Sequence, residues 1–192
     1  MIYPAVRRAC VPVVRTLYRL EVRGADRVPA GGPVVVAANH VSVLDPFVLS
    51  VSIERPLRYL GKAELWKLRP LARVLEALGA IPVARDTGDT AAIAAALAAL
   101  ELGEAVGIFP QGAVRRDAWR RGAARLALAS GAPLLPVRLI GTADALRPGR
   151  VGFPRIAVLI GEPILVDRQE PTAELASALT VRLRASVESL GS

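Results

Sequence analysis

Short apolar runs alternate along this chain with longer segments in which apolar residues recur at helical spacing. The apolar runs predict strands at residues 34–38, 58–60, 79–85, 105–110, 133–141 and 156–160. The segments between them predict helices from about residue 46 and at 65–78, 90–102, 118–130 and 172–190. Gly and Pro stand at the junctions, where turns need them. Strands that alternate with helices of this length predict a layered α/β fold.

Residues 1–20 carry a separate, amphipathic pattern. On a helical wheel, the apolar face consists of Ile2, Val6, Ala9, Val13, Leu17 and Leu20, and the opposite face carries Arg8, Arg15 and Arg19. A basic polar face is typical of a helix that lies in a membrane interface, although a surface helix packed on its own domain shows a similar pattern. Pro12 would kink this helix or divide it in two. We therefore expect a membrane-interface helix over 1–20 and one domain over 21–192.

Length and composition agree with one domain beside a membrane. The chain has 192 residues, the size of a single domain. Its mean hydropathy of +0.40 is high, yet no run reaches the roughly 18 uninterrupted apolar residues of a membrane-spanning helix. The N-terminus lacks the features of a signal peptide, and a single cysteine excludes an internal disulfide. These features predict a peripheral protein at the cytoplasmic face of the membrane, without a transmembrane span.

The formal net charge of +8 favours anionic partners such as nucleic acid, anionic lipid or acidic small molecules. The densest basic segment is 115–125, where arginines interleave with an apolar helical stripe of Ala118, Leu126 and Leu128. Aromatic residues are only 4% of the chain, and no nucleic-acid-binding motif is present. Since charge alone gives only non-specific affinity, we expect a basic face beside a lipid or coenzyme A phosphate site and no nucleic-acid partner. With one His and one Cys, no metal site is expected.

The segment "NHVSVLDP" at 39–46 contains the only histidine, His40, and Asp45 five positions later. One interpretation is a helix start, with Asp45 as N-cap and Pro46 in the first helical position, or with Ser42 as the cap and Asp45 as its reciprocal partner. The other is a catalytic pair. A strand would deliver His40 to the carboxyl edge of the sheet, a common place for active sites, and the turn before the helix would bring Asp45 to the imidazole. An imidazole held in this way can take a proton from a hydroxyl group.

Four sequence blocks follow one another along the chain. The first is "NHVSVLDP", followed by "KAEL" at 62–65; the second is "GAIPVAR" with Gly79, Ile81 and Arg85; the third is "GIFPQG" at 107–112. The fourth contains Pro136 and is reached through "RRGAARLALASGAPLLPV". In this order the blocks resemble those of the 1-acylglycerol-3-phosphate acyltransferases and their lysolipid acyltransferase relatives. The resemblance covers about residues 20–165 and implies a single layered domain with a mixed, mostly parallel sheet flanked by helices.

The resemblance also implies a mechanism. His40 would be the general base that deprotonates the acceptor hydroxyl, and Asp45 would fix its tautomer and stabilise the imidazolium. The hydroxyl oxygen would attack the thioester of acyl-CoA or acyl carrier protein directly, without a cofactor. The substrate-binding residues implied by the motif matches are Asn39, Ser42, Lys62, Arg85, Gln111, Gly112, Arg115 and Arg116. Arginine suits the phosphate of the acceptor because its planar fork binds phosphate oxygens in pairs, and a glycine at 112 would let the backbone approach the ligand.

The third block departs from the family pattern, in which Glu-Gly-Thr-Arg occupies the place of Gln111, Gly112, Ala113 and Val114. A carboxylate has become an amide, and a hydroxyl and an arginine are lost. Arg115 and Arg116 follow at once and could reach the same space. The default acceptor is therefore 1-acylglycerol-3-phosphate, with three alternatives open: another lysolipid, an alcohol or amine on a different scaffold, or no acceptor at all in a lipid-binding protein of the same fold with impaired catalysis.

Overall fold

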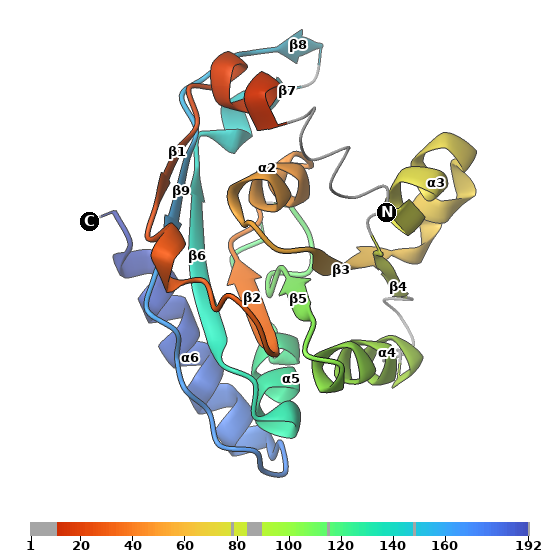
Figure 1. Ribbon diagram of the computed structural model, residues 1–192, viewed down its shortest axis with the longest axis vertical. Coiled ribbons are helices and arrows are strands. Elements are labelled where there is room, and N and C mark those ends of the chain that lie inside the picture. Colours follow the sequence, from red (N-terminus) through yellow and green to blue (C-terminus); the bar gives the residue numbers. More distant parts are fainter. Residues whose placement is uncertain (1–10, 78, 84–89, 115, 148, 192) are drawn as a thin grey trace.

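The computed structural model describes residues 11–77, 79–83, 90–114, 116–147 and 149–191 (Figure 1). Seven strands form one sheet in the order β1-β9-β6-β2-β5-β3-β4. They are β1 Glu21–Arg23, β2 Val34–Ala38, β3 Leu57–Lys62, β4 Ile81–Val83, β5 Ala105–Ile108, β6 Leu134–Ile140 and β9 Ala157–Ile160. All neighbouring pairs are parallel except β6 and β9, which are antiparallel. The mixed, mostly parallel sheet is thus confirmed.

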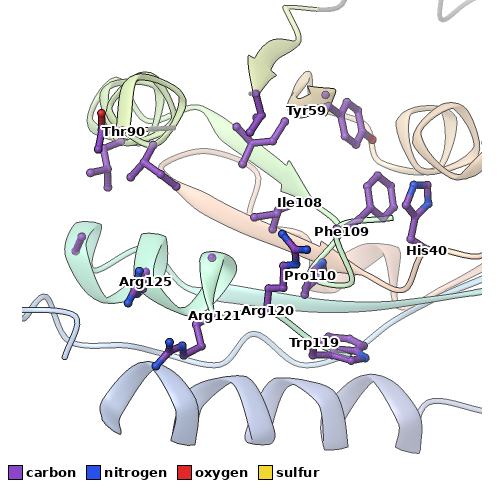
Figure 2. Close-up of a pocket in the computed structure, with 18 of the residues that line it drawn as sticks. His40, Tyr59, Thr90, Ile108, Phe109, Pro110, Trp119, Arg120, Arg121 and Arg125 are labelled. Atoms are coloured by element: carbon purple, nitrogen blue, oxygen red, sulfur yellow. The ribbon is translucent and has the colours of Figure 1, made fainter. Parts of the chain in front are cut away.

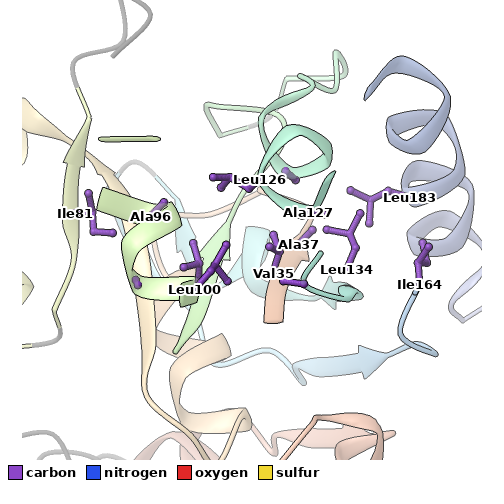
Figure 3. Close-up of a cluster of buried hydrophobic side chains, with 14 of the residues drawn as sticks. Val35, Ala37, Ile81, Ala96, Leu100, Leu126, Ala127, Leu134, Ile164 and Leu183 are labelled. Carbon is purple, nitrogen blue, oxygen red and sulfur yellow. The ribbon is translucent and has the colours of Figure 1, made fainter. Parts of the chain in front are cut away.

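Helices cover both faces of this sheet. Helices α4 Thr90–Glu101, α5 Gly122–Ser130 and α6 Ala173–Ser189 pack on one face, and α2 Asp45–Ser52 packs on the other. Helix α3 Arg69–Ala77 lies beside the β3–β4 edge of the sheet. Strand β2 is buried along its whole length, so its continuous apolar run faces packed side chains on both sides. Val35 and Ala37 pack with residues of α4, α5 and α6, as Figure 3 shows. Val34 and Val36 pack on the other face with residues of α2.

Two predicted helices begin differently from expectation. Residues 65–78 were expected as one helix, but a 3₁₀ turn, η2 Ala63–Lys67, precedes α3. The second residue of α3 is Pro70, which lacks an amide hydrogen and suits the first turn of a new helix. Helix α5 begins at Gly122 rather than near residue 118. The amide of Arg120 donates instead to the carbonyl of Pro110 at 2.9 Å, so the preceding segment is tied to the loop that follows β5.

The structure contains short elements that the apolar pattern did not predict. Besides β1, these are the 3₁₀ turns η1 Ala25–Arg27 and η3 Thr142–Asp144 and a hairpin of β7 Leu146–Arg147 and β8 Arg150–Val151. Each is only two or three residues long, which is too short for a periodic signal.

The N-terminal segment is helical at residues 11–17, consistent with the predicted amphipathic helix, and residues 1–10 of that prediction lie outside the described residues. The segment that follows the helix is anchored to the domain. The Tyr18 ring lies 5.9 Å from that of Phe153, and the Tyr18 carbonyl accepts a hydrogen bond from the amide of Ile156 at 3.0 Å. Within the described ranges, no helix has the length and apolar content needed to cross a bilayer.

Strands β2 and β5 lie side by side at the centre of the sheet and run in the same direction. Ala37 of β2 pairs with Ile108 of β5, so both strands end at the same edge. The two loops that follow them carry His40 and Gln111. The first and third sequence blocks therefore lie together at this edge of the sheet, a common place for active sites in α/β folds.

Candidate active site

The turn between β2 and α2 brings His40 and Asp45 together. His40 Nδ1 lies 2.8 Å from Asp45 Oδ2. A turn closed by the hydrogen bond from the Asp45 amide to the Ser42 carbonyl, at 3.2 Å, reverses the chain between them. Because an ionised carboxylate only accepts, Nδ1 carries the hydrogen of this bond, and Nε2 is left as a proton acceptor.

The Asp45 carboxylate is completely buried and accepts from three donors. Besides the imidazole, Oδ2 accepts from the backbone amides of Val41 at 2.7 Å and Ser42 at 2.8 Å. Asp45 Oδ1 is buried and has no hydrogen-bond partner among the described residues. The carboxylate is thus fixed by the backbone of its own turn, and this turn orients the imidazole.

The helix-cap interpretation is only partly correct. Leu44, not Asp45, is the N-cap of α2, and no side chain caps the helix. The bond from the Ser42 amide to Asp45 is one half of a capping box. The other half is missing, because Ser42 Oγ accepts from the amide of Leu44, at 3.3 Å, and not from that of Asp45. Asp45 therefore serves the helix start and the imidazole at once.

Aromatic rings support the imidazole from one side. Phe109, directly after β5, stacks on His40 with ring centroids 4.3 Å apart and an angle of 23°. Tyr59 of β3 stacks in turn on Phe109 at 6.1 Å. A side chain at Gly107 would place its Cβ 2.6 Å from the Tyr59 ring, so the glycine leaves the room that this ring needs.

An ion pair holds β3, which carries Tyr59, beside β5. Arg58 donates to Glu104 from Nε at 2.6 Å and from Nη2 at 2.9 Å. The hydrogen bond to Glu104 raises the pKa of the Arg58 guanidinium. This pair joins the start of β3 to the residue before β5, next to the register in which Tyr59 pairs with Gly107.

Gln111 connects the loop after β5 to the loop that holds His40. Its side chain is almost completely buried, and Oε1 accepts from the backbone amide of His40. Its Nε2 donates to the carbonyl of Arg116 at 2.5 Å. A glutamate could make the first bond but not the second, because a carboxylate has no hydrogen to donate. The amide at 111 therefore suits the contacts of this chain.

We expect Gln111→Glu to lower the free energy of unfolding by about 1–3 kcal/mol, since it places a charged acceptor against the Arg116 carbonyl. Urea denaturation would measure the change. The matched control is Gln169→Glu, because Gln169 is exposed. Equal effects of the two substitutions would contradict the role given to Gln111.

His40 lines one wall of a cavity of about 950 Å³ between β3, β5, α4 and α5 (Figure 2). Most of its lining is apolar, including Leu65, Val83, Ile93, Leu97, Ile108 and Phe109. Three cations, Arg120, Arg121 and Arg125, contribute the charged part. A cavity of this size and composition suits an apolar chain attached to an anionic group.

The predicted site residues fall into three groups. His40, Asp45 and Gln111 are brought together, and Gly112 lines the cavity with a left-handed φ of +69°. Three others make structural contacts: the Asn39 amide binds both backbone groups of Leu139 in β6, Ser42 is buried beside Asp45, and the Arg116 carbonyl binds Gln111. Arg85, Arg115 and the Lys62 side chain lie outside the described residues. Catalysis by His40 and Asp45, and substrate binding by all the other residues, stay predictions.

The cavity arginines had no role in the predicted site. Arg120, Arg121 and Arg125 lie in the basic segment that we expected to form a face beside a phosphate site, and in the 120–137 connection that resembles the family, but none of them was predicted to bind substrate. Among the described residues, no three His, Cys, Asp or Glu side chains lie close enough together to hold a metal ion.

Comparison with known proteins defines the class. A sequence model of the Acyltransferase family matches residues 19–140, more than half of the chain, and the chain belongs to this family. It is similar to the 1-acyl-sn-glycerol-3-phosphate acyltransferase of Bacillus subtilis, with 28% identity over 174 residues that cover 86% of each protein. The enzyme of the same name from Borreliella burgdorferi is 29% identical over 143 residues, 70% of this chain and 57% of that protein's length.

A solved structure shares the fold. The 1-acyl-sn-glycerophosphate acyltransferase PlsC of Thermotoga maritima superposes with a TM-score of 0.69 over 98% of this chain and 84% of that one, at 20% identity. The expected fold class and the resemblance to this group of acyltransferases are thus confirmed.

Proposed function

We propose that the chain is an O-acyltransferase that moves a fatty acyl group from acyl-CoA or acyl carrier protein to a hydroxyl of a lysophospholipid. The default acceptor is 1-acylglycerol-3-phosphate. The observation that carries the proposal is the 2.8 Å contact between His40 and a fully buried Asp45 at the wall of a mainly apolar cavity. Membership of the Acyltransferase family and the names of the relatives support the reaction class.

In this mechanism His40 is the general base. Its Nε2 takes the proton of the acceptor hydroxyl while the hydroxyl oxygen attacks the thioester carbonyl carbon. The tetrahedral intermediate collapses, the carbon–sulfur bond breaks, and the leaving thiolate takes the proton back from the imidazolium. Asp45 stabilises this imidazolium between the two proton transfers. The acyl group passes directly to the acceptor, and no covalent acyl-enzyme forms.

The apolar part of the cavity would hold the acyl chain. Leu65, Ile93 and Leu97 stand on η2 and α4, and Ile108 and Phe109 lead from there to His40. Each methylene group that leaves water for such a lining contributes about 0.8 kcal/mol. A long-chain donor is therefore expected to bind more tightly than a short-chain one.

Thiol release from long-chain acyl-CoA in the presence of different acceptors tests the proposal. We expect release with lysophosphatidic acid, and the comparison with other lysolipids and uncharged alcohols identifies the preferred acceptor. A preference for an uncharged alcohol would show that the acceptor is not 1-acylglycerol-3-phosphate, while the proposed acyl transfer would stand. Release at background for every acceptor would leave a lipid-binding protein of the same fold and overturn the enzyme proposal.

We also propose that the N-terminal helix contacts an anionic membrane. Val13 and Leu17 belong to its predicted apolar face and are 54% and 45% exposed. Arg15 and Arg19, which belong to the predicted basic face, are exposed as well and suit lipid headgroups. The apolar side chains that would insert into a membrane are therefore exposed to solvent in the described part of this helix.

The double substitution Val13→Asp with Leu17→Asp is expected to weaken binding to vesicles of phosphatidylglycerol and phosphatidylcholine about tenfold or more, because it replaces the inserted apolar groups with charges. Flotation would measure the bound fraction. Substitution preserves Tyr18 and Leu20, which pack on the core and would be lost in a truncation of residues 1–20. The control is Val181→Asp in α6, where the side chain is 69% exposed. Undiminished binding of the double variant would exclude this helix as the anchor.

A further inference from the structure

Three arginines that were not predicted to bind substrate line the cavity. Arg120 and Arg121 immediately precede α5, and Arg125 lies one turn into it. The amide of Arg125 donates to the carbonyl of Arg121 at 2.9 Å, so these two share one side of the helix start. Figure 2 shows Arg120 beside Ile108 and Pro110, with Arg121 and Arg125 farther along, where α5 begins.

Arg120 is the arginine tied most closely to the His40 loop. Its backbone amide is fixed to the Pro110 carbonyl at 2.9 Å. Its side chain passes over Gly112, where an added Cβ would lie 3.3 Å from Arg120 Cδ and Nε. Gly112 follows Gln111, which binds the His40 amide. Gln111 and Gly112 thus connect the His40 backbone to the Arg120 side chain.

The charge of this wall is not balanced by the rest of the described lining. No aspartate or glutamate belongs to the described residues that line the cavity. Arg120, Arg121 and Arg125 form no ion pair with any described residue. The three arginines give this part of the lining a positive charge that a bound anion would balance.

We propose that Arg120, Arg121 and Arg125 bind a phosphate group of the substrate, in the role that the motif comparison assigned to Arg115 or Arg116. A planar guanidinium forms paired hydrogen bonds to phosphate oxygens, and several arginines together fix the position of the phosphate. Arg116 is not among the described residues that line the cavity, and its backbone carbonyl binds Gln111. The inference rests on the proposed function, because the phosphate can belong to the acceptor or to the coenzyme A part of the donor.

The test uses the single variants Arg120→Gln, Arg121→Gln and Arg125→Gln in two pairs of assays. The first pair compares lysophosphatidic acid with uncharged monoacylglycerol as acceptor. The second compares acyl-CoA with the acyl thioester of N-acetylcysteamine, which has no phosphate. The matched control is Arg182→Gln, which removes an exposed arginine from α6.

We expect KM for the phosphate-bearing substrate to rise about tenfold or more with kcat changed little, and most strongly for Arg120→Gln. KM for its phosphate-free counterpart should stay unchanged. A rise confined to lysophosphatidic acid assigns the arginines to the acceptor, and a rise confined to acyl-CoA assigns them to the donor. Equal effects on substrates with and without phosphate, or effects no larger than those of Arg182→Gln, would overturn the proposal.

A binding measurement separates this inference from the proposed function. Calorimetric titration with adenosine 3′,5′-bisphosphate and with glycerol 3-phosphate requires no turnover. We expect at least one of them to bind the full chain, and the triple Arg→Gln variant to lose that binding. If the chain binds but transfers no acyl group, the enzyme proposal fails and the phosphate site stands. If neither compound binds, or if the triple variant binds as well as the unchanged chain, the proposal of a phosphate site is wrong.

Discussion

His40→Ala is expected to lower kcat for acyl transfer by about 10²- to 10⁴-fold, the range that a positioned general base contributes. The variant retains the cavity and its arginines, so KM for the donor should change much less than kcat. Thiol release from long-chain acyl-CoA, with the acceptor that the unchanged chain prefers, measures both constants. The expectation depends on Nε2, the nitrogen that remains free when Nδ1 donates to Asp45 at 2.8 Å.

The control for this prediction must separate chemistry from packing, because the imidazole also stacks on Phe109 at 4.3 Å. His40→Gln retains a polar side chain of similar volume but has no imidazole base. We expect it to unfold at nearly the temperature of the unchanged chain and to be as inactive as His40→Ala. Full activity in either variant would show that another group deprotonates the acceptor.

The central strands and the His–Asp pair were predictable because their signals are local. Val34–Ala38 is a continuous apolar run between a proline and an asparagine, and β2 has these bounds. The pair lies within six residues of sequence, and one turn is enough to close it. Its two interpretations could not be separated from the sequence, because the same carboxylate binds backbone amides at the helix start and the imidazole.

The contacts that complete the site join residues far apart in sequence. Gln111 meets the His40 amide across 71 positions, only because β2 and β5 are parallel neighbours. In the comparison with the family pattern, the amide at 111 was only the loss of a carboxylate. The amide instead gains a bond to Arg116 that a carboxylate cannot make. Such a gain is visible only once the loop geometry is known.

The position of the arginines depended on where α5 begins. A helix from residue 118 would have spread Arg120, Arg121 and Arg125 over a regular helical surface. The bond from the Arg120 amide to Pro110 delays the helix to Gly122 and turns the preceding segment toward the cavity. Apolar periodicity carries no information about this bond, so the sequence indicated a basic face but not which arginines line the cavity.

Asp45→Ala is expected to lower the free energy of unfolding by about 2–4 kcal/mol, because it leaves the amides of Val41 and Ser42 without their acceptor. For a chain of this size, this corresponds to a decrease in Tm of about 5–15 °C. Thermal unfolding followed by circular dichroism would measure it. The matched control is Ser52→Ala in the same helix, which removes a single hydrogen bond to the Val48 carbonyl, made at 2.7 Å. Its expected cost is about 1 kcal/mol, with activity retained in the folded protein.

Asp45→Asn separates the two roles of the carboxylate. The asparagine oxygen can still accept from the backbone amides, but its NH₂ group takes the place of Oδ1, which is buried without a partner among the described residues. The amide also removes the charge that stabilises the imidazolium. We therefore expect a smaller loss of stability than in Asp45→Ala but a decrease in kcat of about 10²- to 10⁴-fold, measured at a temperature where the variant is folded. An asparagine variant with unchanged kcat would reduce Asp45 to a support of the turn, and His40 would then act without a carboxylate behind it.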